Sequence, residues 1–232
     1  MFIGHTAAAL AGKRAATRTS LGVLLAAASF LDLLWPILLL ARVEHVRIAP
    51  GNTAFTPLDF AWYPISHSLM GVLGWSLAAG VIYFAVTRYR SGALTVGVLV
   101  FSHWVLDWLT HRPDLPLWPG GPRVGVGMWH SVPLTLMVEM LLFGVCVAIY
   151  LGTTRPRDGI GRWAFWGLIA IFSGIYLASV FGPPPSDVHT VAWAALATWL
   201  FPLWAWWADA HREVRPQLPE TAFGAVDGPL PA

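Results

Sequence analysis

The sequence has little charge for its length. Aspartate, glutamate, lysine and arginine make up 11% of the 232 residues, whereas 56% are hydrophobic, and the mean hydropathy is +0.62. Soluble domains carry about 25% charged residues. The composition therefore predicts an integral membrane protein rather than a soluble domain.

Cysteine and basic clusters are also scarce. The single cysteine, Cys146, excludes an intramolecular disulfide and a cysteine-rich metal site. The formal net charge is only +2, and no run of basic residues is long enough to form an arm. These two features exclude nucleic acid as an expected partner.

Long hydrophobic segments alternate with short polar ones. A helix needs about 20 apolar residues to cross a bilayer core of ~30 Å. Six segments approach that length, at residues 19–41, 66–87, 93–111, 128–151, 162–181 and 188–208. Residues 1–12 reach only about 18 Å as a helix, which predicts a half-membrane helix whose amino end is buried among the others. We expect an all-α polytopic membrane protein with about six transmembrane helices and this short N-terminal helix.

The ends of the spans suggest domain limits and an orientation. Residues 1–213 are predicted to form one transmembrane domain, and the proline- and glycine-rich residues 214–232 a flexible cytoplasmic tail. If the chain changes sides of the membrane at each of the six spans, ten of its 14 lysine and arginine residues lie on the side of both termini. The other four lie on the opposite side. The positive-inside rule then predicts an inner (plasma) membrane protein with both termini in the cytoplasm.

One apolar segment carries a polar stripe. His103, Asp107 and His111 are spaced four residues apart, so a helix would place them on one face. An ionisable residue inside a span is costly unless it is paired or functional. The His-x-x-x-Asp spacing equals that of the histidine pairs in zinc helices. We therefore interpret the stripe as part of a metal site.

Other segments supply matching groups at similar depth. Counted at 1.5 Å per residue, His5, Asp32 and His67 lie in the middle or outer half of the membrane. Imidazoles and carboxylates suit Zn²⁺, with Mn²⁺ and Fe²⁺ as alternatives. The predicted metal ligands are His5, Asp32, His67, His103 and Asp107. Five ligands exceed a closed tetrahedral site, which leaves either an open catalytic position or a two-metal site.

The expected chemistry is metal-assisted hydrolysis of an ester or phosphoester. Whichever carboxylate of Asp107 and Asp32 is not bound to metal is predicted to act as general base, and His111 or His130 to protonate the leaving group. Because the site lies at bilayer depth, the expected partner is a membrane lipid, and the substrate a lipid or a small-molecule ester.

Two other functions fit the same residues. Chains of histidine and carboxylate also carry ions or protons across membranes, and a bound metal can simply fix the packing of helices. The polar groups concentrate toward the outer side, whereas a transport pathway also needs them at the cytoplasmic end. This asymmetry favours the enzyme.

Four short motifs resemble a known family. GHTAAAL, an aspartate in the next helix, ISHSL, and SHWVLDWLT followed by LPLWP are similar to the pattern of the YdjM-like membrane-bound metal-dependent hydrolases. The resemblance covers about residues 1–120 and implies metal ligation by His5, Asp32, His67, His103 and Asp107. The chain departs from the pattern at FLDLL and WYPISHS, where it lacks one aspartate, one histidine and an arginine. The missing residues are ones that would serve a second metal or neutralise the charge of a substrate.

Overall fold

Helices that suit a membrane make up most of the molecule. The computed structural model describes residues 1–216. Five helices in this part are long and apolar enough to cross a membrane, the last of them with a break: α5 (Leu69–Thr87), α6 (Arg90–Thr110), α7 (Val132–Thr153), α8 (Gly159–Phe181), and α9 (Val188–Ala197) with α10 (Leu200–Ala210). The bent pair α2 (Leu21–Ala28) and α3 (Phe30–Leu40) makes a sixth span if the two helices are counted together. The prediction of an all-α polytopic membrane protein is confirmed.

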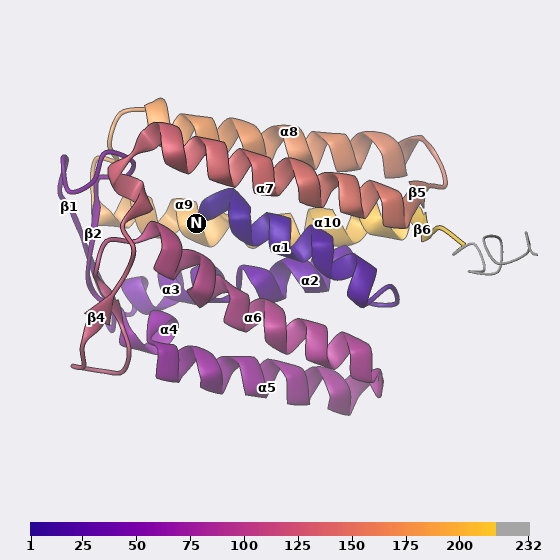
Figure 1. The fold of residues 1–232 in the computed structure, drawn as a ribbon, viewed down its shortest axis with the longest axis horizontal. Coiled ribbons are helices and arrows are strands. Elements are labelled where there is room, and N and C mark those ends of the chain that lie inside the picture. Colours follow the sequence, from indigo (N-terminus) through magenta and orange to yellow (C-terminus); the bar gives the residue numbers. More distant parts are fainter. Residues whose placement is uncertain (217–232) are drawn as a thin grey trace, which may run out of the picture.

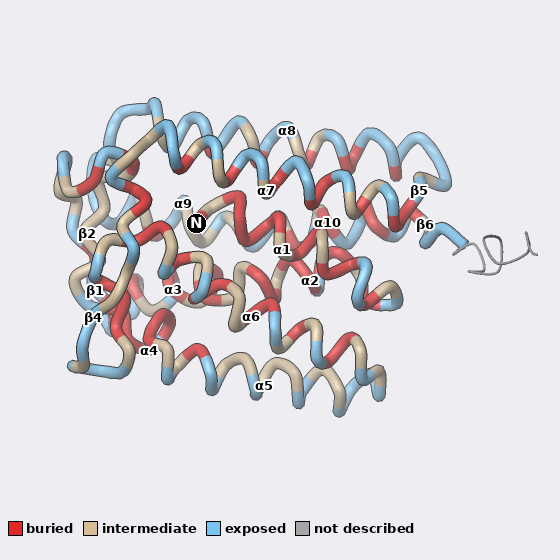
Figure 2. The backbone as a smooth tube through the Cα atoms, viewed as in Figure 1, coloured by how far each residue is buried: buried red, intermediate tan, exposed pale blue. Residues whose placement is uncertain are grey.

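The short first helix lies inside the bundle. Helix α1 (Phe2–Ala15) packs against α2, α6, α7 and α8 (Figure 1). Figure 2 shows α1 buried along most of its length, whereas α5 is exposed or only partly buried along nearly all of its length. Many residues of α1 are small, so the neighbouring helices can approach it closely. The predicted half-membrane helix with a buried amino end is confirmed.

Two spans are broken near their middles. Helices α2 and α3 meet at Ser29 with a bend of 58°, and α9 and α10 are separated at Thr198 and Trp199. The broken spans lie side by side, with α2 against α10 and α3 against α9. The indole N–H of Trp199 donates to the carbonyl of Leu33 at 3.0 Å. The sequence predicted each span as one helix, because no proline or glycine marks either break.

Short hairpins cap one end of the bundle. The predicted outer loops contain the antiparallel pairs β1 (His45–Ile48) with β2 (Leu58–Trp62) and β3 (Leu115–Pro116) with β4 (Arg123–Val124). The short helix α4 (Pro64–His67) follows the first hairpin, and the 3-10 turn η1 (Met128–His130) follows the second. The span predicted from residue 128 therefore begins only at Val132. Figure 1 places these hairpins at the end opposite to the pair β5 (Thr154–Pro156) and β6 (Arg212–Val214).

The chain stays attached to the bundle after residue 213. Val214 pairs with Thr154 in the β5–β6 pair, and the N–H of Arg215 donates to the carbonyl of Thr153 at 2.9 Å. The beginning of the predicted tail is therefore held in place. Residues 217–232, the rest of the predicted cytoplasmic tail, lie outside the described part of the chain.

A buried carboxylate joins four helices at the β5–β6 end. Asp209 of α10 accepts hydrogen bonds from Lys13 Nζ of α1 at 2.7 Å, from the Leu21 N–H of α2 at 3.0 Å and from the Tyr150 hydroxyl of α7 at 2.6 Å. Asp209 and Lys13 are both buried. Because a buried charge without a partner is strongly unfavourable, this pair fixes how the four helices meet.

Replacing Asp209 by alanine leaves the Lys13 ammonium buried without its counterion. We expect Asp209→Ala to lower the free energy of unfolding by about 3–5 kcal/mol, measured by denaturant titration of the purified protein in detergent. The control is Glu213→Ala, which removes an exposed ion pair with Arg155 and should change stability far less. Equal effects of the two substitutions would contradict a structural role for the buried pair.

Candidate metal centre

Helix α6 supplies a histidine and an aspartate from one buried face. His103 and Asp107 lie one turn apart, and His103 Nε2 is 3.2 Å from Asp107 Oδ2. On its other side His103 Nδ1 donates to the carbonyl of Ala28 at 2.8 Å. Ala28 ends α2, so its carbonyl has no partner within that helix. The hydrogen bond orients the imidazole with Nε2 toward the site, as metal-binding histidines require.

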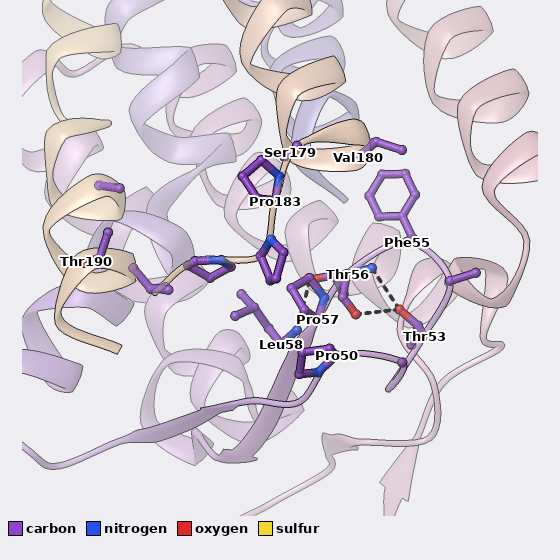
Figure 3. Close-up of a pocket in the computed structure, with 17 residues that line it drawn as sticks. Pro50, Thr53, Phe55, Thr56, Pro57, Leu58, Ser179, Val180, Pro183 and Thr190 are labelled. Atoms are coloured by element: carbon purple, nitrogen blue, oxygen red, sulfur yellow. Dashed lines mark hydrogen bonds between the residues drawn. The ribbon is translucent and has the colours of Figure 1, made fainter. Parts of the chain in front are cut away.

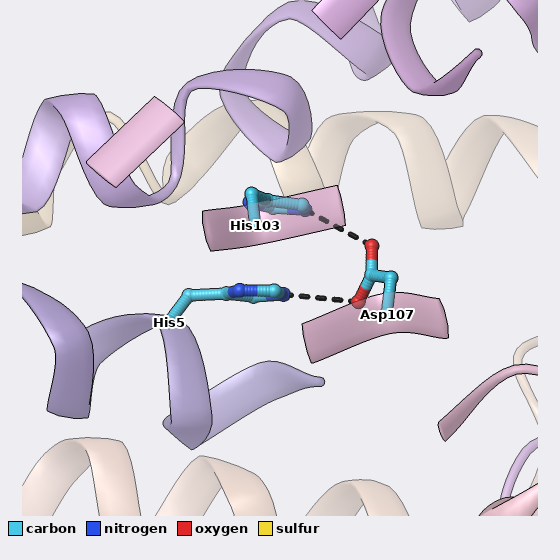
Figure 4. A group of neighbouring side chains, drawn as sticks. All are labelled: His5, His103 and Asp107. Carbon is cyan, nitrogen blue, oxygen red and sulfur yellow. Dashed lines mark hydrogen bonds and ion pairs between the residues drawn. The ribbon is translucent and has the colours of Figure 1, made fainter. Parts of the chain in front are cut away.

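Helix α1 brings a second imidazole against the first. The ring of His5 stacks on that of His103, with centroids 3.5 Å apart and planes 6° apart. His5 Nε2 lies 3.1 Å from Asp107 Oδ1, and the amino group of Met1 contacts the same oxygen. Figure 4 shows both rings directed at the two oxygens of Asp107. The burial of α1 therefore places His5 at the site.

Helices α3 and α4 supply the remaining two groups. His67 Nε2 is 3.6 Å from Asp32 Oδ1 and 3.8 Å from Asp107 Oδ2. Asp32 Oδ1 is also 3.7 Å from His103 Nε2. Asp32 lies in the first turn of α3, where the helix dipole favours a negative charge. The structure thus brings together all five residues that the sequence predicted as ligands.

The donors form two overlapping groups suited to a metal ion. One group is His5, His103 and Asp107, the other is Asp32, His67 and His103, and within each the donor atoms lie within 4.8 Å of one another. Ligands of a tetrahedral zinc ion, bound at about 2.0–2.1 Å, are separated by roughly 3.3 Å. The separations of 3.2–3.8 Å from Asp32 and Asp107 to His67 and His103 come close to that value.

An unpartnered nitrogen supports the same conclusion. His103 Nε2 is buried and has no hydrogen-bond partner in the described chain. His103 Nε2 lies near the carboxylates of Asp32 and Asp107, but its contact with neither of them has the geometry of a hydrogen bond. A buried polar atom without a partner is unfavourable, and a cation held between the imidazoles and carboxylates would satisfy it. The buried His/Asp cluster therefore fits a metal ion.

A carboxylate outside the predicted site holds His67 in place. Glu44, 1% exposed, accepts the N–H groups of Ile65 and Ser66 on Oε1, each at 2.8 Å. Its Oε2 accepts the Ser66 hydroxyl at 2.6 Å, and the Ser66 oxygen lies 2.6 Å from His67 Nδ1. Because the Ser66 hydroxyl donates its hydrogen to Glu44, its oxygen accepts a hydrogen bond from the Nδ1–H of His67. This leaves His67 Nε2 without a proton and facing Asp32. Glu44 lies between the predicted spans 19–41 and 66–87, and no local sequence pattern predicted this role.

The two predicted proton donors lie outside both groups. His111 follows the last residue of α6 with an extended backbone, so it departs from the helical stripe. Its Nδ1 is 2.9 Å from Asp114 Oδ1, and its ring packs 4.1 Å from that of Trp129. His130 is exposed at the end of η1. A catalytic role for either histidine remains a prediction.

Aromatic side chains cover the cluster on the hairpin side. Tyr63, 1% exposed, packs 5.2 Å from the His67 ring and 5.3 Å from the Phe60 ring. Its hydroxyl donates to Asp114 Oδ1 at 3.2 Å. Burial raises the pKa of Tyr63 well above its ordinary value, and the negative charge of Asp114 adds to this. Tyr63 therefore remains a neutral hydrogen-bond donor to Asp114.

Comparison with known proteins shows no family for this chain. No family model and no solved structure matches it. A stretch of 87 residues is 39% identical to a tyrosine decarboxylase of Oryza sativa subsp. japonica, which is 35% of this chain and 16% of that protein. The chain thus spans less than a fifth of the length of this relative, and so short a match does not show membership of its family.

The role of Glu44 can be tested by removing its charge. We expect Glu44→Gln to lower the affinity for Zn²⁺ by about ten- to a hundredfold, because the bonds that orient Ser66 and His67 weaken. The measurement is equilibrium competition with a zinc chelator. Asp59→Asn, which alters an acid of the same hairpin paired with Arg112, should bind Zn²⁺ like the wild type. Wild-type affinity in a folded Glu44→Gln protein would contradict the assignment.

Proposed function

We propose that the protein is a metal-dependent hydrolase of esters or phosphoesters in the inner membrane. The observation that supports this most strongly is that His67 and His103 each lie within 3.2–3.8 Å of both Asp32 and Asp107, while His103 Nε2 has no hydrogen-bond partner among the described residues. The motif resemblance to YdjM-like hydrolases supports the same reading. Imidazole and carboxylate donors favour Zn²⁺, with Mn²⁺ or Fe²⁺ as alternatives.

The five residues take different parts in this proposal. Catalytic zinc sites use three protein ligands and keep a fourth position open. We assign His67, His103 and Asp107 as the three ligands. His5 supports Asp107 from its other oxygen, where its Nε2 lies 3.1 Å away. A bound divalent ion acts as a Lewis acid and allows water to lose its proton near neutral pH.

Asp32 is the best placed general base. Its side chain is 45% exposed, whereas that of Asp107 is 3% exposed and enclosed by three histidines. A water molecule beside Asp32 can give its proton to the carboxylate and attack the carbonyl carbon or the phosphorus. The bond to the leaving oxygen then breaks, and the proton passes from Asp32 to that oxygen.

The placement in the membrane belongs to the same proposal. The excess of basic residues on the side of both termini supports a cytoplasmic location for that side. The hairpins β1–β2 and β3–β4 then face outward, and the metal site lies beneath them. A substrate that reaches this depth is a membrane lipid with an ester or phosphoester linkage, or a small apolar ester.

Removing one ligand tests the proposal directly. We expect His103→Ala to reduce bound zinc, measured by mass spectrometry of the purified protein, to about a tenth of the wild-type content or less. Hydrolysis of a panel of carboxylic and phosphoric esters should fall with it. A chelator should abolish wild-type hydrolysis, and added Zn²⁺ should restore it.

The control is His189→Ala, which removes an exposed histidine at the start of α9 and should leave zinc content and hydrolysis intact. A His103→Ala protein with full metal content would rule out this histidine as a ligand. Wild-type protein that binds zinc but hydrolyses no member of the panel would rule out the hydrolase.

A further inference from the structure

Two neighbouring cavities flank the short helix α4. The first has a volume of about 450 Å³ and is lined by α4, by the first half of α5 and by Pro119; we call it the α5 groove. The second has a volume of about 120 Å³ and is lined by residues 62–64 and by the turn of the β3–β4 hairpin with Arg123; we call it the hairpin pocket. Pro64 lines both cavities, and Pro119 of the first is followed in the chain by Gly120 of the second. The two cavities therefore adjoin.

Small residues on α5 form the α5 groove. Gly71, Gly74 and Ala78 line it at spacings of three and four residues, so they lie on one face of the helix. Gly74 is exposed, and a Cβ atom added to it would meet no atom within 4 Å. The indole of Trp75 forms part of the wall and is held by a hydrogen bond from its N–H to the carbonyl of Ile65 at 2.9 Å. The groove is thus open and apolar.

The α5 groove has the length of an acyl chain segment in one leaflet. Met70, at its start, is 62% exposed, and α5 is apolar enough to cross a membrane. The eight residues from Met70 to Ala78 rise about 12 Å along the helix, and one leaflet of the hydrocarbon core is about 15 Å thick. A chain that enters the bilayer beside Met70 therefore finds the groove along most of its leaflet.

The hairpin pocket carries a positive charge that no acidic residue balances. Arg123 is exposed, and its Nη2 donates to the carbonyl of Ala61 at 2.8 Å. Among the described residues Arg123 forms no ion pair, whereas Arg112, before the same hairpin, is paired with Asp59 and Asp114. A guanidinium group has five N–H donors in a planar fork that matches a phosphate group. Arg123 therefore has donors left for an anionic ligand.

The hairpin pocket lies at the level of the membrane surface. Trp62, which lines it, and Trp118 in the adjoining turn are 41% and 45% exposed, and exposed indoles gather at the membrane–water interface. The N–H of Met70 donates to the carbonyl of Leu117 at 3.0 Å, which holds the β3–β4 hairpin at the start of α5. The charged cavity thus lies at the surface, and the apolar one extends from it into the bilayer.

Another outer cavity lacks this combination. It has a volume of about 470 Å³ and lies between the β1–β2 hairpin and the helices α8 and α9 (Figure 3). None of its lining residues is charged. The hydroxyl of Thr53 donates to the carbonyl of Thr56 at 3.0 Å, and that of Thr190 donates to Asp187 at 2.9 Å. This cavity therefore has no charge with which to select an ionic ligand.

We propose that the α5 groove and the hairpin pocket together bind a phospholipid of the leaflet on the hairpin side. The lipid phosphate accepts hydrogen bonds from the guanidinium group of Arg123, and one acyl chain lies along α5 beside Gly74. The headgroup is then at the membrane surface and the chain points toward the bilayer centre, as in the leaflet itself. This inference goes beyond the proposed hydrolysis and does not depend on it.

The bound lipid lies beside the wall of the metal centre. Tyr63 lines the hairpin pocket and Ser68 lines the α5 groove. His67, between them in the chain, is buried and lines neither cavity. The lipid therefore covers the outer side of α4 without touching this histidine.

Photolabelling in a detergent without phosphate tests the site. The purified protein in dodecyl maltoside is given phosphatidylglycerol with a diazirine midway along one acyl chain, and labelled peptides are identified by mass spectrometry. We expect labels on α5 between Met70 and Ala78, which excess unlabelled phosphatidylglycerol displaces and diacylglycerol does not. Gly74→Phe, which fills the groove, and Arg123→Ala, which removes the phosphate donor, should each lower this labelling by about fivefold or more.

Each variant has a matched control. Gly144 is exposed on α7, and a Cβ atom added to it would also meet no atom within 4 Å. Gly144→Phe therefore adds the same ring to a lipid-facing glycine outside both cavities. Arg47→Ala removes an exposed arginine of β1 that lines neither cavity. Both controls should be labelled on α5 like the wild type.

Four results would overturn the proposal. Diacylglycerol or inorganic phosphate alone could displace the label as well as phosphatidylglycerol does, which would show that no phospholipid is recognised. Gly74→Phe or Arg123→Ala could be labelled like the wild type. The control variants could lose labelling equally. Finally, the wild type could elute from a sizing column as a dimer that Gly74→Phe converts to a monomer, in which case a second copy of the chain covers the groove.

Discussion

The enclosure of Asp107 by three imidazoles is the interaction on which the structure of the site depends. A carboxylate in the interior of a membrane protein is costly unless cations or hydrogen-bond donors surround it. His5, His67 and His103 approach its two oxygens from α1, α4 and α6. The position of α1 in the middle of the bundle follows the same requirement, because only a buried α1 can bring His5 to this carboxylate.

The irregular parts of the fold support these imidazoles. The break at Ser29 ends α2 at Ala28, whose carbonyl orients His103. The same break starts α3, so that Asp32 lies in a first helical turn. After α3, Glu44 accepts a hydrogen bond from Ser66, further along the chain, and Ser66 in turn orients His67. A straight helix in place of α2 and α3 would remove the free carbonyl and the helix start together.

Particular residues show how far sequence reasoning reached. The spans were predicted closely, since a long apolar segment has few alternatives in a bilayer. The stripe from His103 to Asp107 was placed correctly on α6, but His111 was not, because α6 ends at Thr110. Glu44 was missed because it acts on a residue 22 positions away, and no local pattern marks that contact. The breaks at Ser29 and Thr198 carry no distinctive sequence either.

The sequence by itself determined the membrane class, the approximate number of spans and the identity of the candidate donors. These are local properties: apolar length selects spans, and ionisable residues within spans are rare enough to stand out. Only the tertiary structure decided that the donors converge, that Asp32 alone among them is accessible, and that Glu44 supports His67. These features depend on contacts between segments as far apart as His5 and Asp107, 102 residues along the chain, and packing rather than local pattern brings such segments together.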